Sequence, residues 1–520
     1  MASAIHSQPY DASLSHKNQL VLKNGGNVAY LLRLLYPIFL YLSVILAFLS
    51  ILITIFSLRH HSNDGVKLPP GSFGWPIIGE SIEFLFGKPE NFVNYRMTKY
   101  SQEIFKTKIF GEKTAVICGP NGNKFLFSNE RKIFTGFLPH SKQKLFLSSK
   151  PEPAAAPPVP PPHAMAAVAA DDVKEVIRTP GFFKPEALSS YLGIIDSISQ
   201  QHSKTLNGKA KMNFYPLAKT LTLSIACRIF LGMENPDRIV RLVCYFDDVT
   251  LGLHSIMVNF PGTIFYRADK AADAIRRKLM AVVRERRASM VGGGGAMKQD
   301  ILSHMIVVSD STGKGMGEVE IADKIMGLLV AGYANVAATI SFFMKFVGES
   351  PDIYNKVLSE QLEISKDKKT GKLLDWNDMS KMKYSWNVMC EVMRVVPPQQ
   401  GTFREVLTDF TYAGYTIPKG WKVYWTVNTT NKNSKYFRDP EKFDPSRYEG
   451  GETPAPYTYV PFGGGPRLCP GKEYARLVVL TFIHNVVKKY KWEVLFPKEK
   501  VLGDMVPMPE KGVPIRLHPH

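Results

Sequence analysis

The chain has 520 residues, 45% of them hydrophobic and 21% charged, a composition typical of a globular protein that can bury a large core. This length exceeds the usual size of one domain, so we expect two or three domains or one unusually large fold. The formal net charge is +19, but the Lys and Arg residues are dispersed, which argues against a nucleic-acid-binding protein. A basic face toward an anionic membrane or an acidic partner protein fits better, and a basic surface with no partner is an equal alternative.

Residues 34–58 form an uncharged apolar run at the amino end, LLYPIFLYLSVILAFLSILITIFSL. A helix of this length can cross a hydrocarbon core of about 30 Å, and the run exceeds the apolar region of a cleaved signal, about 7–15 residues. We therefore predict a transmembrane anchor at 34–58, with a tail at 1–33 and a basic, proline-rich hinge at 59–71. A buried core helix is the alternative. The positive charges on the two sides of the run are balanced, so they do not indicate which end of an anchor faces the cytosol.

The body, residues 72–520, combines a few strand patterns with many helical patterns. Alternating β-branched residues predict strands at 103–110 and 113–119, and a second strand-rich patch lies at 408–427. Helices are predicted at 185–201, 217–230, 268–289, 318–348, 354–366 and 470–490. The tract at 151–162 holds seven prolines in twelve residues and cannot be a helix or a central strand. The expected class is mainly α, in an α+β arrangement.

The five cysteines are odd in number, widely spaced and never paired as C-x-x-C, which argues against a disulfide framework or a zinc site and fits a reducing compartment. One of them, Cys469, lies in the stretch FGGGPRLCPG at 462–471. Glycines permit positive φ and a close approach to a flat ligand, and the start of the following helix would stabilise a thiolate. This pattern suits axial ligation of haem iron, with Arg467 placed to pair with a propionate. A buried free cysteine beside an ordinary turn is the alternative.

The same stretch resembles the haem-binding signature of the cytochrome P-450 superfamily, F-x-x-G-x-R-x-C-x-G, at every fixed position. Two further signatures follow the family order. EVMR at 391–394 resembles the family's E-x-x-R, whose charges share one helix face, and FDPSRY at 443–448 resembles its aromatic-Arg segment. The resemblance implies an ion-pair network of Glu391, Arg394 and Arg447.

The resemblance implies the P-450 fold, with a large helical domain and a smaller β-rich region preceded by one transmembrane helix. Haem b would be the cofactor, O2 the co-substrate, and NADPH the electron source through a diflavin reductase that docks near Lys472 and Arg476. Cys469 would be the axial iron ligand, and Phe462 would shield its thiolate. The implied cofactor-binding positions are Cys469, Arg467, Arg404, Phe462, Gly463, Gly465 and Gly471.

The likeness extends from about Leu68 to the carboxyl terminus, and segments such as FGWPIIGES and IPKGWKVYW resemble plant triterpene oxidases of the β-amyrin 28-oxidase type. A group acting on diterpenoids is also close. This implies a monooxygenase that hydroxylates an apolar plant terpenoid, a triterpenoid or diterpenoid, or oxidises one methyl group stepwise to the acid. Implied substrate contacts are Val330 and the segment 399–403. The implied location is the endoplasmic reticulum membrane, single-pass, with the catalytic domain in the cytosol.

Two departures from the family pattern stand out. The helix expected to cross the oxygen side of the haem reads AGYANVAA at 331–338, so Ala334 and Asn335 occupy the positions of the usual acid and hydroxyl that relay protons; with Gly332 they would form the oxygen-side groove. Asn335 can hydrogen-bond but cannot ionise, which keeps open a reductase-independent isomerase or dehydratase, or a non-catalytic haem-binding membrane scaffold. The second departure is the Pro/Ala tract, after which Lys174 and Arg178 are the candidates to replace a haem-contacting Arg.

Overall fold

The computed structural model describes residues 35–37, 39–54, 66–147, 183, 185–208, 210–291, 300–311, 316–366, 372–450, 454–503 and 505–520. They divide into an N-terminal unit, Met1–Val66 with Trp75–Ile77, and a body, Lys67–Gly74 with Ile78–His520. The proline tract at 151–162, together with Lys174 and Arg178, lies outside the described residues.

The N-terminal unit contains an apolar helix, Leu35–Thr54, whose mean hydropathy reaches 2.4. Its hydroxyl groups bond back to the helix: Thr54 Oγ1 donates to the carbonyl of Ser50 at 2.7 Å, and Ser43 Oγ to that of Leu40 at 2.7 Å. Two helices of the body are also long and apolar enough to cross a membrane, but 61% and 78% of their apolar windows are buried. Those two helices therefore build the core of the body.

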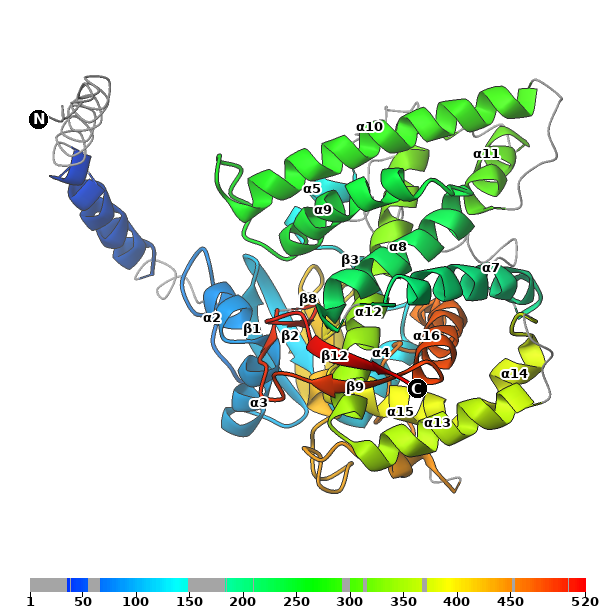
Figure 1. Ribbon diagram of the computed structural model, residues 1–520. Helices are drawn as coiled ribbons and strands as arrows, with labels where there is room; N and C mark the ends of the chain where they lie inside the picture. The colour runs from blue at the N-terminus through cyan, green and yellow to red at the C-terminus, as the bar shows by residue number, and fades with distance from the viewer. Residues whose placement is uncertain are drawn as a thin grey trace, which may run out of the picture. The chain divides into compact units, whose positions relative to one another are not determined.

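The body is dominated by helices (Figure 1). They are α2 (Ser81–Phe86), α3 (Pro89–Lys99), α4 (Gly119–Ser128), α5 (His140–Phe146), α7 (Pro185–Lys204), α8 (Phe214–Leu231), α9 (Pro236–Gly252), α10 (Ile264–Val291), α11 (Ile301–Ser311), α12 (Glu318–Gly348), α13 (Pro351–Lys366), α14 (Trp376–Lys381), α15 (Lys383–Val395) and α16 (Lys472–Val487), with 3-10 turns η1 (Val427–Thr429), η2 (Pro445–Tyr448) and η3 (Gly465–Arg467). The bounds of α12 match the sequence prediction of 318–348, because an uninterrupted apolar pattern marks a buried helix.

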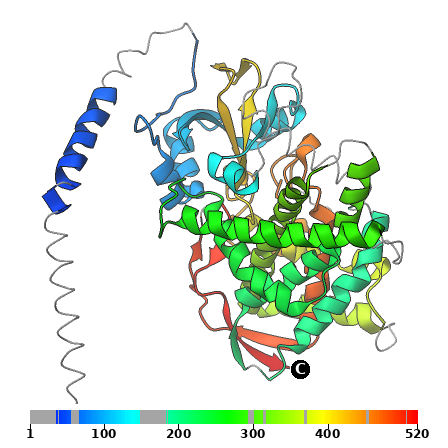
Figure 2. The ribbon, with the colours of Figure 1, turned by 90° about the horizontal axis from the view of Figure 1, so that it is seen from above.

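The strands of the described residues form four small sheets. They are β1 (Ile104–Ile109), β2 (Glu112–Ile117), β3 (Phe134–Phe137), β4 (Lys211–Asn213), β5 (Gly401–Val406), β6 (Phe410–Tyr412), β7 (Tyr415–Ile417), β8 (Lys422–Thr426), β9 (Tyr490–Val494), β10 (Val501–Leu502), β11 (Met508–Pro509) and β12 (Pro514–Pro519). The largest sheet has the order β1-β2-β8-β5-β3, and only its β2–β8 pair is parallel. Figures 1 and 2 show its strands gathered on a side of the body away from α13 and α14.

Helix α12 organises the helical part because its apolar side chains are buried along most of its length. It contacts α8, α10, α15 and α16, and Thr222 Oγ1 of α8 donates to the carbonyl of Tyr333 at 3.2 Å. Near its carboxyl end, Trp492 Nε1 of β9 donates to the carbonyl of Met344 at 2.7 Å. Residues 331–339 are thereby held in the middle of the body.

Candidate functional site

The loop that carries Cys469 is seated against α4. Gly463 and Gly465 adopt φ of 71° and 62°, values that favour glycine. A Cβ on Gly464 would lie 2.4 Å from the ring of Phe127, and one on Gly465 would lie 2.4 Å from the carbonyl oxygen of Phe127. The glycines expected to admit a flat ligand therefore also allow the loop to approach α4 closely.

Cys469 follows this loop directly, and the residue is exposed. Its backbone N–H donates to the carbonyl of Phe462 at 3.0 Å, which closes the turn around the cysteine. The prediction of a helix at 470–490 was wrong at both ends, because Gly471 caps a helix that begins only at Lys472 and ends at Val487, while Tyr490 starts β9. Cys469 thus precedes the first helical turn, next to its N–H groups.

Arg404 and Arg467 meet at one carboxylate. Arg404 Nε, on β5, lies 2.5 Å from Glu130 Oε1, and Arg467 Nε, on η3, lies 3.0 Å from Glu130 Oε2. All three side chains are buried. Arg404 Nη1 also donates to Thr402 Oγ1 at 2.8 Å. The sequence predicted both arginines as members of one site but had no signal for Glu130, which lies 274 residues from Arg404.

A small cavity of about 50 Å³ lies between α12, α15, α16 and Phe462. Asn335 and Thr339 of α12 line it, together with mainly apolar side chains such as Met389 and Val479. Thr339 Oγ1 donates to the carbonyl of Asn335 at 2.7 Å, so this hydroxyl is engaged within the helix. The side chain of Asn335 is therefore the main hydrogen-bonding group that α12 presents here.

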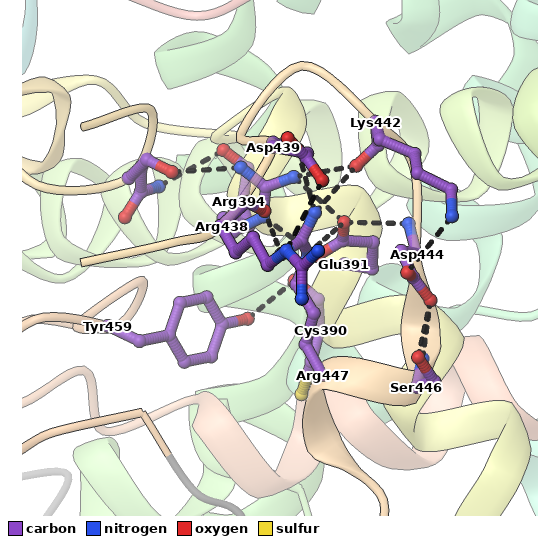
Figure 3. A network of polar contacts seen from close by, with 11 residues as sticks. Cys390, Glu391, Arg394, Arg438, Asp439, Lys442, Asp444, Ser446, Arg447 and Tyr459 are labelled. Carbon is purple, nitrogen blue, oxygen red and sulfur yellow. Dashed lines mark hydrogen bonds and ion pairs between the residues drawn. The ribbon is translucent and has the colours of Figure 1, made fainter. Parts of the chain in front are cut away.

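The charged residues of the E-x-x-R and aromatic-Arg segments are in contact (Figure 3). Arg394 and Glu391 of α15 form two hydrogen bonds of 2.8 Å, and both side chains are fully buried. Arg447 Nε of η2 approaches Glu391 Oε1 at 3.3 Å, while Arg394 Nη1 donates to the carbonyl of Asn431 at 2.9 Å. Burial lowers the pKa of Arg394, but the hydrogen bonds that Arg394 donates to Glu391 and the negative charge of Glu391 outweigh burial and raise the pKa. The network fastens the segment before the Cys469 loop to α15.

These features fit a haem group. Cys469 is exposed at the end of its glycine-rich loop, which suits a thiolate ligand of the iron. The buried pair Arg404 and Arg467 suits carboxylates at the edge of the haem. In addition, a Cβ at Gly136 would lie 2.3 Å from Arg467 Nη1, so the sheet leaves room for this guanidinium.

The Cytochrome P450 family model matches residues 69–514. The chain belongs to the cytochrome P450 family. It is similar to a β-amyrin 28-monooxygenase from Medicago truncatula, 48% identical over 92% of this chain and 98% of the relative, and to one from Saponaria officinalis, 48% identical over 90% of this chain and 95% of the relative. The solved structure of retinoic acid-bound cyanobacterial CYP120A1 has a TM-score of 0.75 and 29% identity, covering 88% of this chain and all of that one.

As a cytochrome P450, the protein is a haem-thiolate monooxygenase that uses haem b, O2 and electrons from NADPH through a reductase. This bears out the expected fold family, enzyme class and cofactors. The three positions predicted for the oxygen side have different surroundings: Gly332 faces Phe230, where a Cβ would lie 3.3 Å from the ring, and Ala334 is buried. Of the three, only Asn335 lines the cavity, and Ala331, one turn earlier, is exposed.

The residues implied to contact substrate differ in burial. Val330 of α12 is buried. In the segment 399–403, Phe403 is buried and Gln400 Oε1 accepts a hydrogen bond from Asn428 Nδ2 at 2.8 Å. Thr402 is half-buried and bonded to Arg404. The side chain of Gln400 is thus engaged with Asn428.

An open groove lies beside the cavity, on the α13, α15 and α16 side. Arg476 lines it, with its guanidinium carbon 5.5 Å from the ring centre of Trp386. Lys356 and Lys383 lie on the same groove, which also carries Glu449. Of the two positions predicted for reductase docking, Lys472 and Arg476, Arg476 lies on this basic and aromatic groove, whose other residues the sequence patterns did not indicate.

Proposed function

We propose that this cytochrome P450 hydroxylates an apolar plant terpenoid of the β-amyrin type and carries oxidation of one methyl group stepwise to the acid. The observation that carries this proposal is 48% identity to β-amyrin 28-monooxygenases over 90% or more of the chain. The apolar lining near Asn335 is consistent with a substrate that has few polar groups. A diterpenoid skeleton is the second candidate class.

In this proposal Cys469 provides the axial thiolate, Arg404 and Arg467 bind the propionates, and Phe462 lies on the thiolate side. The glycines at 463, 465 and 471 keep the loop close to α4 and to the cysteine. Support comes from the exposure of Cys469 and from the two buried guanidiniums. When bound, haem supplies the centre at which O2 is activated.

Asn335 is proposed to act on the oxygen side by orienting a hydroxyl group of an ordered water or of the substrate. Its amide both donates and accepts hydrogen bonds but carries no titratable proton. Ala334, at the position of the usual acid, is buried and offers no polar group. Proton delivery in this enzyme would therefore depend on a hydroxyl held by Asn335 rather than on an acid of α12.

The reductase is proposed to dock over the groove of Lys356, Lys383 and Arg476, with Lys472 nearby. Lysine and arginine around an open groove with Trp386 and Tyr384 would attract an acidic partner surface and give it aromatic contacts. The groove lies next to the cavity, since Arg476 and Trp386 line both. Electrons would therefore enter near the proposed haem position.

The anchor at 34–58 is proposed to hold the protein in the endoplasmic reticulum membrane as a single-pass protein, followed by the hinge at 59–71, with the monooxygenase domain at 72–520 in the cytosol. The hydropathy of the helix Leu35–Thr54 supports an anchor. The body also exposes apolar side chains at α2 and between α9 and α10, including Phe86, 78% exposed, and Phe260, 68% exposed. Both segments lie on the same side of the body in Figures 1 and 2, as a membrane-facing surface requires.

The test is co-expression with a plant reductase, feeding of triterpene and diterpene skeletons, and identification of products by mass spectrometry. We expect oxygenated products from β-amyrin-type skeletons that require NADPH and are lost in Cys469→Ala. Turnover of an oxygenated substrate without NADPH would instead indicate an isomerase or dehydratase. Product formation by Cys469→Ala would contradict the proposal. So would a wild-type enzyme that binds haem but forms no product from any of the skeletons.

A further inference from the structure

We propose that Glu130 is a positioning residue for haem, which holds Arg404 and Arg467 together as one dicationic receptor for the two carboxylates at the edge of the macrocycle. The inference rests on the proposed roles of these two arginines as propionate partners. Glu130 does not itself contact the cofactor in this proposal. It acts through the orientation of the two guanidiniums and through its negative charge.

The contacts define a shared carboxylate. Each oxygen of Glu130 faces the Nε of a different arginine, at 2.5 Å for Arg404 and 3.0 Å for Arg467. The Glu130 side chain is 0% exposed, and those of Arg404 and Arg467 are 9% and 5% exposed. Since a guanidinium is a rigid planar fork, a contact at Nε constrains the direction in which its terminal nitrogens point. The Glu130 carboxylate thereby orients the Arg404 fork through a hydrogen bond, and it holds Arg467 beside it through an ion pair that lacks hydrogen-bond geometry.

A tight turn delivers Glu130 to this position. After α4, the carbonyl of Asn129 accepts hydrogen bonds from Lys132 N at 3.2 Å and Ile133 N at 3.0 Å, and Arg131 N donates to the carbonyl of Phe134 at 2.8 Å. Arg131 adopts a φ of 66°, so the chain reverses sharply here. The turn is therefore held by backbone bonds that do not depend on the Glu130 side chain.

The strand that follows the turn contacts the same arginines a second time. Gly136 of β3 is the register partner of Arg404 on β5, and a Cβ at Gly136 would lie only 2.3 Å from Arg467 Nη1. Segment 130–136 thus meets Arg404 and Arg467 at both of its ends. Two points of contact from one short segment fix the pair more firmly than one ion pair could.

The charge of Glu130 allows the proposal to be tested through the reduction potential of the haem, which a residue that served only for packing would not change. Replacing its carboxylate by an amide adds one net positive charge close to the proposed propionate site. Reduced haem carries one positive charge fewer than oxidised haem, so the added charge favours the reduced form and raises the reduction potential. Weaker positioning of the two guanidiniums should also speed haem release.

The experiment compares full-length holoenzyme with Glu130→Gln, Glu130→Asp and the matched control Glu405→Gln. Glu405 is a half-buried carboxylate of the same sheet, next to Arg404 in sequence, but it pairs with Lys422 at 3.3 Å. Spectroelectrochemistry gives the reduction potential, and transfer of haem to excess apomyoglobin gives the release rate. In Glu130→Gln we expect a higher potential and haem release about tenfold faster. Glu130→Asp should keep the potential and release haem at an intermediate rate, and Glu405→Gln should change neither.

An unchanged potential and release rate in Glu130→Gln would overturn the inference, as would an equal shift in Glu405→Gln. If Glu130→Gln does not fold, Gly136→Ala tests the positioning alone, because its Cβ displaces Arg467 without a change of charge; wild-type haem release in that variant would contradict the inference. These outcomes are separate from the proposed function. A protein that binds haem and shows the predicted shifts but oxidises no terpenoid would refute the substrate proposal only.

Discussion

Tyr333 Oη donates a hydrogen bond of 2.5 Å to Asp247 Oδ1 and so ties α12 to α9 next to Ala334 and Asn335. Lys219 Nζ of α8 lies 2.7 Å from the other carboxylate oxygen of Asp247. A carboxylate therefore does lie close to α12, but it belongs to α9. Since Tyr333 and Asn335 are two positions apart on a helix, they point in nearly opposite directions, and Asp247 is on the side away from the cavity.

Tyr333→Phe should destabilise the body without changing the cavity. Burial and the adjacent Asp247 raise the pKa of Tyr333 well above its usual range, so the phenol is a neutral donor at any working pH. Its loss leaves Asp247 short of one partner, and we expect about 1–2 kcal/mol lower free energy of unfolding. Urea unfolding would measure it, with Tyr95→Phe as the exposed control. Equal stability of both variants would contradict this role.

Asn335→Ala should lower the yield of product per NADPH consumed, because no side-chain group of α12 would then orient a hydroxyl beside the cavity. We expect a loss of about tenfold or more, with a smaller loss in Asn335→Thr, which restores a hydroxyl. Haem content measured in parallel separates coupling from cofactor loss. If Asn335→Ala forms as much product per NADPH consumed as the wild type, Asn335 has no role in proton delivery.

Glu391→Gln should be among the most damaging single substitutions. The side chains of Glu391 and Arg394 are fully buried, and removing one partner of such a pair leaves an uncompensated buried charge at a cost of about 3–5 kcal/mol. Thermal unfolding and yield of folded protein are the measurements. The control is Glu493→Gln, which breaks an exposed pair with Arg516 and should change stability by less than about 1 kcal/mol.

Acid should destabilise the body partly through His254. Burial, with the charge of Lys142, lowers its pKa to about 3, so between about pH 6.5 and 3 the unfolded chain binds a proton that the folded chain does not. Stability should rise with pH across this window, by at most about 1.4 kcal/mol per pH unit from this group, and level off above it. His254→Leu should flatten the slope, and an unchanged slope would show that His254 is not buried in its neutral form.

Lys356→Glu and Lys383→Glu should weaken reductase-supported turnover. Both residues line the proposed docking groove. Reversing their charge should therefore raise the reductase concentration needed for half-maximal rate, and this concentration should then depend less on salt. The spectrum of the reduced, CO-bound haem should not change. Lys278→Glu, on the exposed side of α10, is the control, and equal effects of all three would refute a specific surface.

The sequence could predict elements and groups whose signals are local. Helix α12 was predicted to the residue because its apolar pattern is continuous, and the Cys469 loop carries its glycines within a few positions. The start of α16 was missed because Gly471 ends the loop and delays the helix to Lys472. Glu130 could not be predicted, since its partners lie hundreds of residues away. The pairing of β3 with β5 brings Arg404 to it, and the seating of the Cys469 loop on α4 brings Arg467.

The seat of the Cys469 loop on Phe127 has a consequence for how the cofactor is acquired. Because Gly464 and Gly465 already lie in contact with α4, the conformational entropy of ordering this loop is lost when the chain folds, not when haem arrives. Cys469 is then already in position before haem binds. Haem binding should accordingly cost little conformational entropy, and Phe127→Ala, which removes the surface that orders the loop, should slow it.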